Sequence, residues 1–383
     1  MSWGVYVHIP FCRRKCWYCD FVSAPGTRGQ MTAYVKALQR EIKIEGRRLR
    51  ERGVTPPRTV YLGGGTPTAL PVNLLLSVIE SLREDILALT AEGEEREFTV
   101  EVNPGTVDAS YLAQLKKAGV NRLSLGVQSF DDGILQNIGR IHCGEEAAEA
   151  VTLAQKLGFP EVSLDLMYAL PGQSLDVLQK DVARALSLAP THLSVYGLQV
   201  EEGTPLFQQV ADGKIILPSE DEAEAMYDYL TNFLPSQGYS RYEISNFALP
   251  GHESRHNMGY WQDASYIGFG AAAHSYWQGE RYQNTADVGA YIAAIPQDEP
   301  IREPEEVMTR EIAMAEFCFL ALRTAQGLDK ERFRHKFGVS LAEVYGEVIN
   351  GNKNKGLLVE NENFCRLTPL GMKYGNMVFA DFC

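Results

Sequence analysis

The sequence predicts an α/β fold: a partial barrel of six strand–helix units, followed by a smaller helical domain that is winged-helix-like. Three observations support this expectation. Short runs rich in Val, Leu, Tyr and Thr alternate with helical patterns from residue 4 to about residue 235. Glycine or polar residues follow nearly every run, and the alternation ends after residue 235. In a parallel barrel, functional residues lie at the carboxyl ends of the strands.

The predicted strands are short and rich in Val, Leu, Tyr and Thr, as in a sheet buried on both faces. They are expected at residues 5–9, 59–62, 98–102, 122–127, 162–167 and 192–200. Helices are expected where apolar residues recur at helical spacing, at residues 31–49, 71–89, 108–118, 144–158 and 174–189. Six units close less of a barrel than eight, so a lateral gap wide enough for a bulky substrate is expected.

We expect three parts: a core barrel at residues 1–235, a bridge or cap at 236–302, and a C-terminal domain at 303–383. The bridge is rich in Tyr, Trp, His, Asn and Gly and lacks clear periodicity. The C-terminal domain shows helical patterns, a hairpin candidate and a final helix, at 308–322, 328–337, 341–350, 356–368 and from Pro369. Its basic residues admit DNA binding, but a winged helix in an acidic enzyme is more often a protein-contact module. These residues are Lys330, Arg332, Arg334 and Lys336.

Composition narrows the function. The 383 residues carry a formal charge of −13, which argues against nucleic-acid binding, where a basic footprint is expected. No apolar run reaches the length of a membrane span, and no leader pattern precedes the first strand, so a cytoplasmic protein without a transmembrane segment is expected. Four of the seven cysteines are scattered and have no predicted role: Cys143, Cys318, Cys365 and Cys383.

The other three cysteines, Cys12, Cys16 and Cys19, lie within eight residues. Their C-x3-C-x2-C spacing can hold three irons of a [4Fe–4S] cluster and leaves the fourth iron without a protein ligand. A structural zinc site usually has four ligands, and the nearest further candidate, His8, lies in a predicted strand. Buried inert thiols are the other alternative, but the basic residues 13–15 favour thiolates. The spacing therefore favours an iron–sulfur cluster.

Further candidate residues follow the predicted strands. The glycines at 63–65 permit positive φ and close approach of a ligand to backbone N–H groups, although a tight turn is the simpler alternative. Glu101 is placed to bind ribose hydroxyls or, alternatively, to pair with a neighbour, and Gln128 and Asp165 occupy corresponding positions. Arg140 offers a bidentate fork suited to a carboxylate. Together these strand ends predict one site.

The cysteine motif resembles that of the radical S-adenosylmethionine (SAM) superfamily, in which SAM binds the open iron. The wider pattern resembles the family of oxygen-independent coproporphyrinogen III dehydrogenases (HemN) and its relatives. The shared strings are Tyr-Val-His-Ile-Pro-Phe-Cys, Gly-Gly-Gly-Thr-Pro, Glu-Val-Asn-Pro-Gly, Gly-Val-Gln-Ser-Phe, Gly-Arg-Ile-His and Leu-Asp-Leu-Met. The resemblance implies a SAM site formed by Tyr6, Tyr18, Gly64, Gly65, Thr66, Glu101, Gln128, Arg140 and Asp165.

One departure distinguishes the branches of this family. Dehydrogenases resemble C-x3-C-x2-C-x-C, whereas this chain has Phe21 at the last position and only eleven residues before the first cysteine. Both differences resemble the haem-chaperone branch, HemW. So does the H-N-x-x-Y-W pattern that begins at His256 and includes Tyr260 and Trp261. If His256 is an axial haem ligand, it is expected to face a porphyrin-sized cavity. His252 and His274 are alternative candidates for the ligand.

The resemblance implies a haem chaperone with a [4Fe–4S] cluster, SAM and haem. Its partner would be a haem acceptor, such as a respiratory and membrane-bound haem protein. The alternative is an enzyme that decarboxylates porphyrinogen propionates by radical chemistry. A radical SAM enzyme that acts on RNA is disfavoured by the acidic charge.

Overall fold

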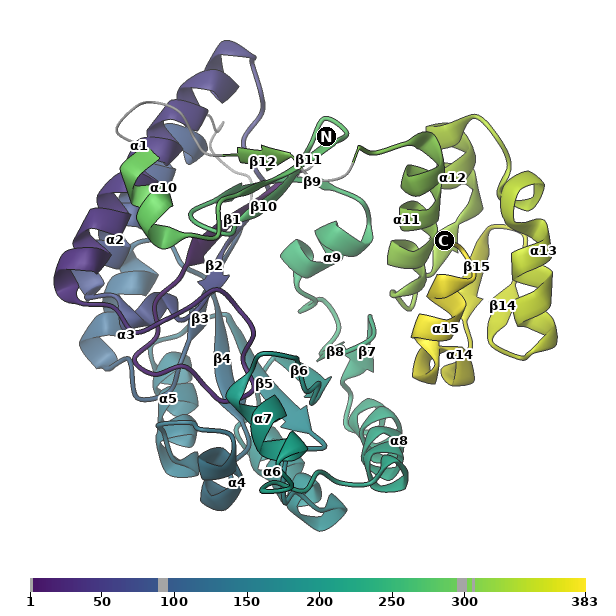
Figure 1. The fold of residues 1–383 in the computed structure, drawn as a ribbon, viewed down its shortest axis with the longest axis horizontal. Helices are drawn as coiled ribbons and strands as arrows, with labels where there is room; N and C mark the ends of the chain where they lie inside the picture. The colour runs from purple at the N-terminus through teal and green to yellow at the C-terminus, as the bar shows by residue number, and fades with distance from the viewer. Residues whose placement is uncertain (1–2, 89–95, 295–301, 305–306) are drawn as a thin grey trace.

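The computed structural model describes residues 3–88, 96–294, 302–304 and 307–383. A curved sheet forms the centre, with helices on its outer side (Figure 1). Its strand order is β12-β11-β10-β9-β1-β2-β3-β4-β5-β6-β8-β7. Strands β1 to β6 are neighbours in chain order and run parallel, as expected for a partial barrel.

All six predicted strands are present: β1 (Trp3–Ile9), β2 (Thr59–Gly64), β3 (Glu97–Val102), β4 (Arg122–Gln128), β5 (Glu161–Tyr168) and β6 (His192–Gly197). The connecting helices are α1 (Arg28–Glu51), α2 (Val72–Leu82), α3 (Ala109–Lys117), α4 (Asp132–Asn137), α5 (Gly144–Lys156) and α6 (Leu175–Ser187). The helix expected at 71–89 is α2 followed by a π-helical turn, η2 (Arg83–Leu87), and residue 89 lies outside the described residues. A short 3-10 turn, η1 (Pro67–Ala69), precedes α2.

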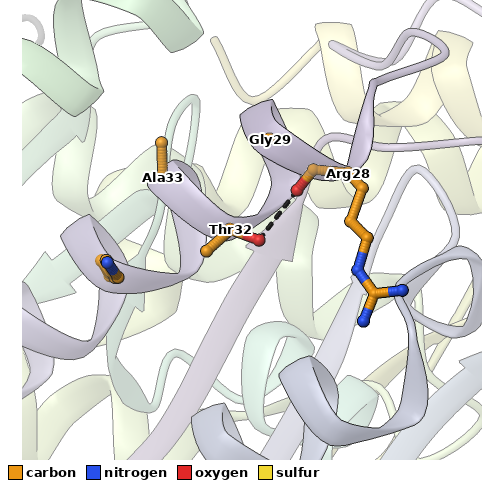
Figure 2. A pocket seen from close by; sticks show the side chains of 5 residues that line it. Arg28, Gly29, Thr32 and Ala33 are labelled. Carbon is orange, nitrogen blue, oxygen red and sulfur yellow. Dashed lines mark hydrogen bonds between the residues drawn. The ribbon is translucent and has the colours of Figure 1, made fainter.

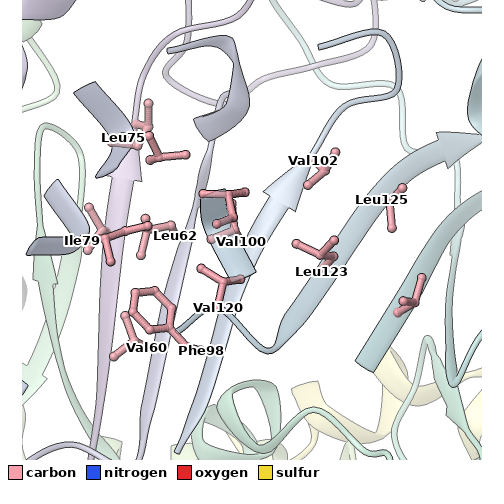
Figure 3. Close-up of a cluster of buried hydrophobic side chains, with 14 of the residues drawn as sticks. Val60, Leu62, Leu75, Ile79, Phe98, Val100, Val102, Val120, Leu123 and Leu125 are labelled. Atoms are coloured by element: carbon pink, nitrogen blue, oxygen red, sulfur yellow. The ribbon is translucent and has the colours of Figure 1, made fainter. Parts of the chain in front are cut away.

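The hydrophobic core lies between the sheet and the outer helices. In Figure 3, side chains from β2, β3 and β4 pack with Leu75 and Ile79 of α2. Leu62 and Val100 are fully buried there. Burial of such a side chain contributes about 1.5–3 kcal/mol. A change such as Leu62→Ala would cost about 2–5 kcal/mol, because the helix cannot fully close the cavity.

The inner face of the sheet is polar instead. Residues alternate between the two faces of a strand, so the residues between the apolar ones point inward. Hydrogen bonds join these inner residues across neighbouring strands, as between Tyr61 and Glu101 (2.8 Å) and between Ser124 and Asp165 (3.0 Å). The barrel therefore has a polar interior that leads to the carboxyl ends of its strands.

The bridge is more regular than expected. Helices α7 (Pro205–Ala211) and α8 (Glu220–Ser236) precede it. The bridge itself contains β7 (Ser240–Arg241), β8 (Asn246–Ala248), α9 (Arg255–Trp261), β9 (Ser265–Phe269), β10 (His274–Trp277), β11 (Glu280–Asn284), α10 (Val288–Ala294) and the start of β12 (Arg302–Pro304). Strand β9 extends the sheet beyond β1, and β8 extends it beyond β6. The sequence of this segment shows no clear periodicity because its strands are too short to show alternation.

The C-terminal part has the expected helices and hairpin. It comprises α11 (Arg310–Leu322), β13 (Leu328–Asp329), α12 (Lys330–Phe337), α13 (Leu341–Asn354), β14 (Leu358–Glu360), β15 (Phe364–Leu367), α14 (Pro369–Lys373) and α15 (Gly375–Ala380). These elements enclose a second hydrophobic cluster around Phe317 and Phe333. The C-terminal domain was expected to start at residue 303, and residues 305 and 306 lie outside the described residues.

The basic side chains of α12 make contacts within the protein. Lys330 pairs with Glu360 at 2.7 Å, and Lys336 pairs with Asp263 of the segment after α9. Arg332 donates to the backbone oxygen of Gln262 in the same segment. These contacts fit a module that packs against the rest of the chain. Within the described residues, no helix has the length and apolar character to span a membrane.

Candidate functional site

The cysteine loop connects β1 to α1 and is held at several points. Cys12 N donates to Ala24 O (3.1 Å), which closes the loop at its base. Trp17 N donates to Ile138 O (3.1 Å), and Trp17 O accepts a hydrogen bond from Leu206 N (2.9 Å). The loop is thus fixed between the segment after α4 and the start of α7.

The three thiols are free and half-buried. Cys12 Sγ lies 3.5 Å from Thr66 Oγ1, and Cys16 Sγ lies 3.5 Å from Arg140 Nη1. Burial raises the pKa of the Cys19 thiol, and the neighbouring Cys16 and Cys12 raise it further. The loop thus presents three thiols as potential metal ligands, and the guanidinium beside Cys16 favours its thiolate form.

Among the described residues, no three His, Cys, Asp or Glu side chains are arranged around the position of one metal ion. A [4Fe–4S] cluster does not require such convergence, because each thiolate binds a different iron. The three-cysteine loop therefore fits a cluster with one open iron. His8, weighed as a fourth zinc ligand, instead contacts Tyr6 and the backbone oxygen of Val22 at 3.0 and 2.9 Å.

The glycine segment at the end of β2 lies against the cysteine loop. Gly64 has a φ of +106°, and a Cβ there would lie 2.5 Å from the His8 ring. A Cβ on Gly65 would lie 2.8 Å from Phe11 O, so glycine is required at both positions. The backbone N–H groups of this segment were expected to be open to a ligand, but two of them are already used. Gly64 N donates to Glu101, and Gly65 N donates to Ile9 O. The segment fixes the loop and Glu101 in place.

Arg140 and Thr66 are joined by Asn103, which the sequence analysis did not assign. Arg140 Nη2 donates to Asn103 Oδ1 and to Gly126 O. Asn103 Nδ2 donates to Thr66 Oγ1 (3.2 Å), and the Thr66 side chain does not cap the next turn. Arg140 Nε is buried and has no hydrogen-bond partner. Its unused donor fits a carboxylate ligand at this position.

Glu101 and Asp165 form an acidic pair on the inner face of the sheet. Glu101 accepts hydrogen bonds from Tyr61 Oη (2.8 Å) and Gly64 N (3.2 Å). Burial raises the pKa of Glu101 to about 8, and the charge of Asp165 contributes. Burial also raises the pKa of Asp165 to about 6. A ligand with positive charge or hydroxyl donors would relieve this unfavourable burial.

The remaining predicted residues surround this arrangement. The Tyr6 ring stacks on Tyr61, with centroids 6.3 Å apart, and faces Glu101. Tyr18 lies beside Arg140 and Cys16, and burial raises its pKa. Gln128 has a φ of +69°, unusual for a residue with a side chain. The predicted cluster and SAM residues thus lie on the inner face of the sheet, as Tyr6 and Asp165 do, or at the carboxyl ends of β1 to β5.

His256 lies elsewhere, at the amino ends of the strands. Its Nδ1 is hydrogen-bonded to Thr59 Oγ1 (2.8 Å), and its Nε2 to Tyr260 Oη (2.9 Å). The backbone N–H groups of Arg255 and His256 both donate to Glu97 at 2.8 Å. Burial lowers the pKa of His256 to about 3. Helix α9 therefore forms a hydrogen-bonded floor of the barrel.

The space beside His256 is smaller than the porphyrin-sized cavity that was expected. The cavity there measures about 30 Å³, room for about one water molecule. His252, a rival ligand, binds Glu161 at 2.9 Å. A larger hollow elsewhere is shallow and lies on α1, where Arg28, Thr32 and Lys36 line it (Figure 2). It includes none of the predicted site residues.

Comparison with known proteins shows the family and the fold of this chain. Residues 6–185 match the radical SAM superfamily, and residues 308–374 match the HemN C-terminal domain. The solved structure of coproporphyrinogen III oxidase (HemN) from Escherichia coli is similar with a TM-score of 0.84. The two sequences are 24% identical, and the match covers 100% of this chain and 90% of the HemN chain. That similarity confirms the fold.

Two relatives share nearly their full length with this chain. Heme chaperone HemW from Lactococcus lactis subsp. lactis is 38% identical over 99% of this chain and 97% of its own length. Heme chaperone HemW from Bacillus subtilis is 39% identical over 99% of this chain and 98% of its own. The chain therefore belongs to the HemW family within the radical SAM superfamily.

Proposed function

We propose that this protein is a haem chaperone that carries a [4Fe–4S] cluster, binds SAM, and takes up haem for delivery to an acceptor protein. The observation that carries the proposal is the joined arrangement of Cys12, Thr66, Asn103, Arg140 and Cys16 at the carboxyl ends of the strands. It combines thiol donors with an unused guanidinium donor. The full-length similarity to two proteins named as haem chaperones supports the haem part.

Cys12, Cys16 and Cys19 would hold the cluster, which supplies an open iron for a chelating ligand and electrons for SAM cleavage. Thr66 and Arg140 contact the sulfurs and would fix the orientation of two thiolates. Charge-assisted hydrogen bonds of this kind also stabilise the thiolate forms.

The SAM part of the proposal rests on complementary charge. SAM carries a carboxylate and a positive sulfonium. Arg140 has a buried donor, Nε, for the carboxylate. Glu101 and Asp165 offer acceptors whose pKa values are raised mainly by burial, which the charges of Arg122 and Arg140 offset only in part for Asp165. Ribose hydroxyls and the sulfonium would provide the missing donors and positive charge.

The haem ligand is a separate question. Ligation by His256 requires both of its ring hydrogen bonds to break and α9 to leave the barrel floor. Phe21, at the position where the dehydrogenase motif has a cysteine, is 61% exposed on the cysteine loop. An exposed aromatic side chain near the cluster supports an apolar contact for a porphyrin there. We propose that the protein binds haem in the cytoplasm and then transfers it to a respiratory acceptor.

The experiment that tests this function offers two substrates to the anaerobically reconstituted protein. One sample receives haem, and the other receives coproporphyrinogen III with SAM and a reductant. Haem uptake without decarboxylation is the expected result. Conversion of coproporphyrinogen to a product that has lost carboxyl groups would contradict the chaperone function and select the enzyme.

A further inference from the structure

We propose that Asp181, on α6, is a positioning residue for the SAM site and acts by holding the turn that presents Gln128. This proposal rests on the proposed function, because it assumes that Gln128 contacts SAM. Asp181 lies on a helix at the outer side of the barrel, and the residue is 2% exposed. Its role follows from its contacts with the end of β4.

Strand β4 ends in a strained turn. Ser129 N donates to Val127 O at 2.9 Å, which closes a three-residue turn around Gln128. The φ of +69° at Gln128 is in the left-handed region, where a side chain is unfavourable unless surrounding contacts hold it. The pairing of β4 with β5 shifts register between Gly126 and Gln128 at the same point. The conformation therefore needs an external restraint.

Asp181 supplies that restraint from one side. Ser129 Oγ donates to Asp181 Oδ2, and Phe130 N donates to Asp181 Oδ1, both at 2.7 Å. The two carboxylate oxygens thus bind two consecutive residues after Gln128. Ser174 already caps α6 through Val177 N, so the carboxylate is not needed to begin its own helix.

Two side chains hold the turn from the other side. His142 Nε2 donates to Val127 O (3.2 Å), and Arg140 Nη2 donates to Gly126 O. A Cβ on Gly126 would lie 3.2 Å from Gln128 Nε2 and 3.3 Å from Arg140 Nη2. The Gln128 amide and the Arg140 head group therefore both lie over this glycine. A turn released by Asp181 would move this amide away from the site.

The test measures SAM affinity by calorimetry in the reconstituted protein. Asp181→Asn keeps the shape of the side chain but can no longer accept both hydrogen bonds. We expect it to weaken SAM binding roughly tenfold, the factor equivalent to one hydrogen bond, with cluster iron unchanged. Glu41→Gln is the matched control, because Glu41 is also a buried carboxylate that binds a backbone N–H and a tyrosine hydroxyl. It should leave SAM affinity unchanged.

A double-variant cycle identifies the route of the effect. If Asp181 acts through Gln128, adding Asp181→Asn to Gln128→Ala should weaken SAM binding no further than Gln128→Ala alone. In thermal melts, Asp181→Asn should cost less stability in a Gln128→Gly background, because glycine tolerates the positive φ. Independent, additive losses of SAM affinity would overturn the proposal.

Failure of the inference is distinguishable from failure of the proposed function. Wild-type affinity for SAM in a folded Asp181→Asn protein would overturn the positioning role alone. Absence of SAM binding in the reconstituted wild-type protein would contradict the proposed function itself. If Asp181→Asn does not fold, Ser129→Ala removes one of the two contacts and makes the same prediction in the same cycle.

Discussion

The ring of Tyr61 stacks on the imidazole of His256, with centroids 5.1 Å apart and an angle of 20° between the planes. The hydroxyl group of the same tyrosine donates to Glu101. One aromatic side chain thus connects the floor of the barrel, formed by α9, to the acidic pair of the candidate SAM site. The histidine of the H-N-x-x-Y-W pattern faces the polar interior of the barrel.

Replacement of His256 by Ala should mainly lower stability. The change removes two buried hydrogen bonds and a stacked ring, so a loss of about 2–4 kcal/mol is expected in the free energy of unfolding. Denaturant unfolding measures it, and haem absorption should stay unchanged. Tyr260→Phe, which removes one of those hydrogen bonds, should lower the free energy of unfolding by a smaller amount. A changed haem spectrum with normal stability would establish ligation instead.

Cluster content should depend on three cysteines. Cys12→Ser, Cys16→Ser and Cys19→Ser should each abolish the brown chromophore and lower iron and sulfide content, because three thiolates are needed to hold the cluster. Cys143→Ser is the control, since that residue precedes α5 and lies outside the loop. A full cluster in the Cys16→Ser protein would refute the assignment.

Arg140→Ala should weaken SAM binding by about 1.5–3 kcal/mol, the scale of a hydrogen bond to a charged group. Calorimetry on the reconstituted protein measures the change. Arg184→Ala serves as the comparison, because that arginine lies on the exposed side of α6 and pairs with Glu145. Equal SAM affinities in the two variants would show that Arg140 does not contribute to SAM binding.

The raised pKa of Glu101 predicts that the stability of the protein depends on pH. Its pKa is raised from 4.5 to about 8, so the folded SAM-free protein holds this proton more tightly than the unfolded chain. Stability from this group is present at low pH and is lost as pH rises from 4.5 towards 8. Denaturant unfolding across that range should show a shallower decline in Glu101→Gln. An identical slope in both proteins would contradict the assigned environment.

SAM binding should favour the ionised form of Glu101 over its protonated form, because the positive sulfonium stabilises a carboxylate. Near neutral pH, binding should therefore release a proton, and the calorimetric enthalpy should vary with the ionisation enthalpy of the buffer. In Glu101→Gln this variation should shrink. Proton uptake on binding would show that SAM does not meet the acidic pair.

Much of the site could be predicted because its residues follow parallel strands at one edge of a sheet. Asn103 was missed although it follows Glu101 closely, since an uncharged amide gives no signal until its partners are known. The surroundings of His256 could not be predicted either. Thr59 and Glu97 are 197 and 159 residues away in sequence, so only the fold brings them to the histidine.

The central claim is that the protein binds haem as cargo. Its most direct test is to mix the anaerobically reconstituted protein with haem, separate the mixture by gel filtration, and record the absorption of the protein peak. The account predicts that haem elutes with the protein in a saturable, stoichiometric amount and has a shifted absorption band. Elution of all the haem as free ligand, with cluster and SAM binding intact, would contradict it.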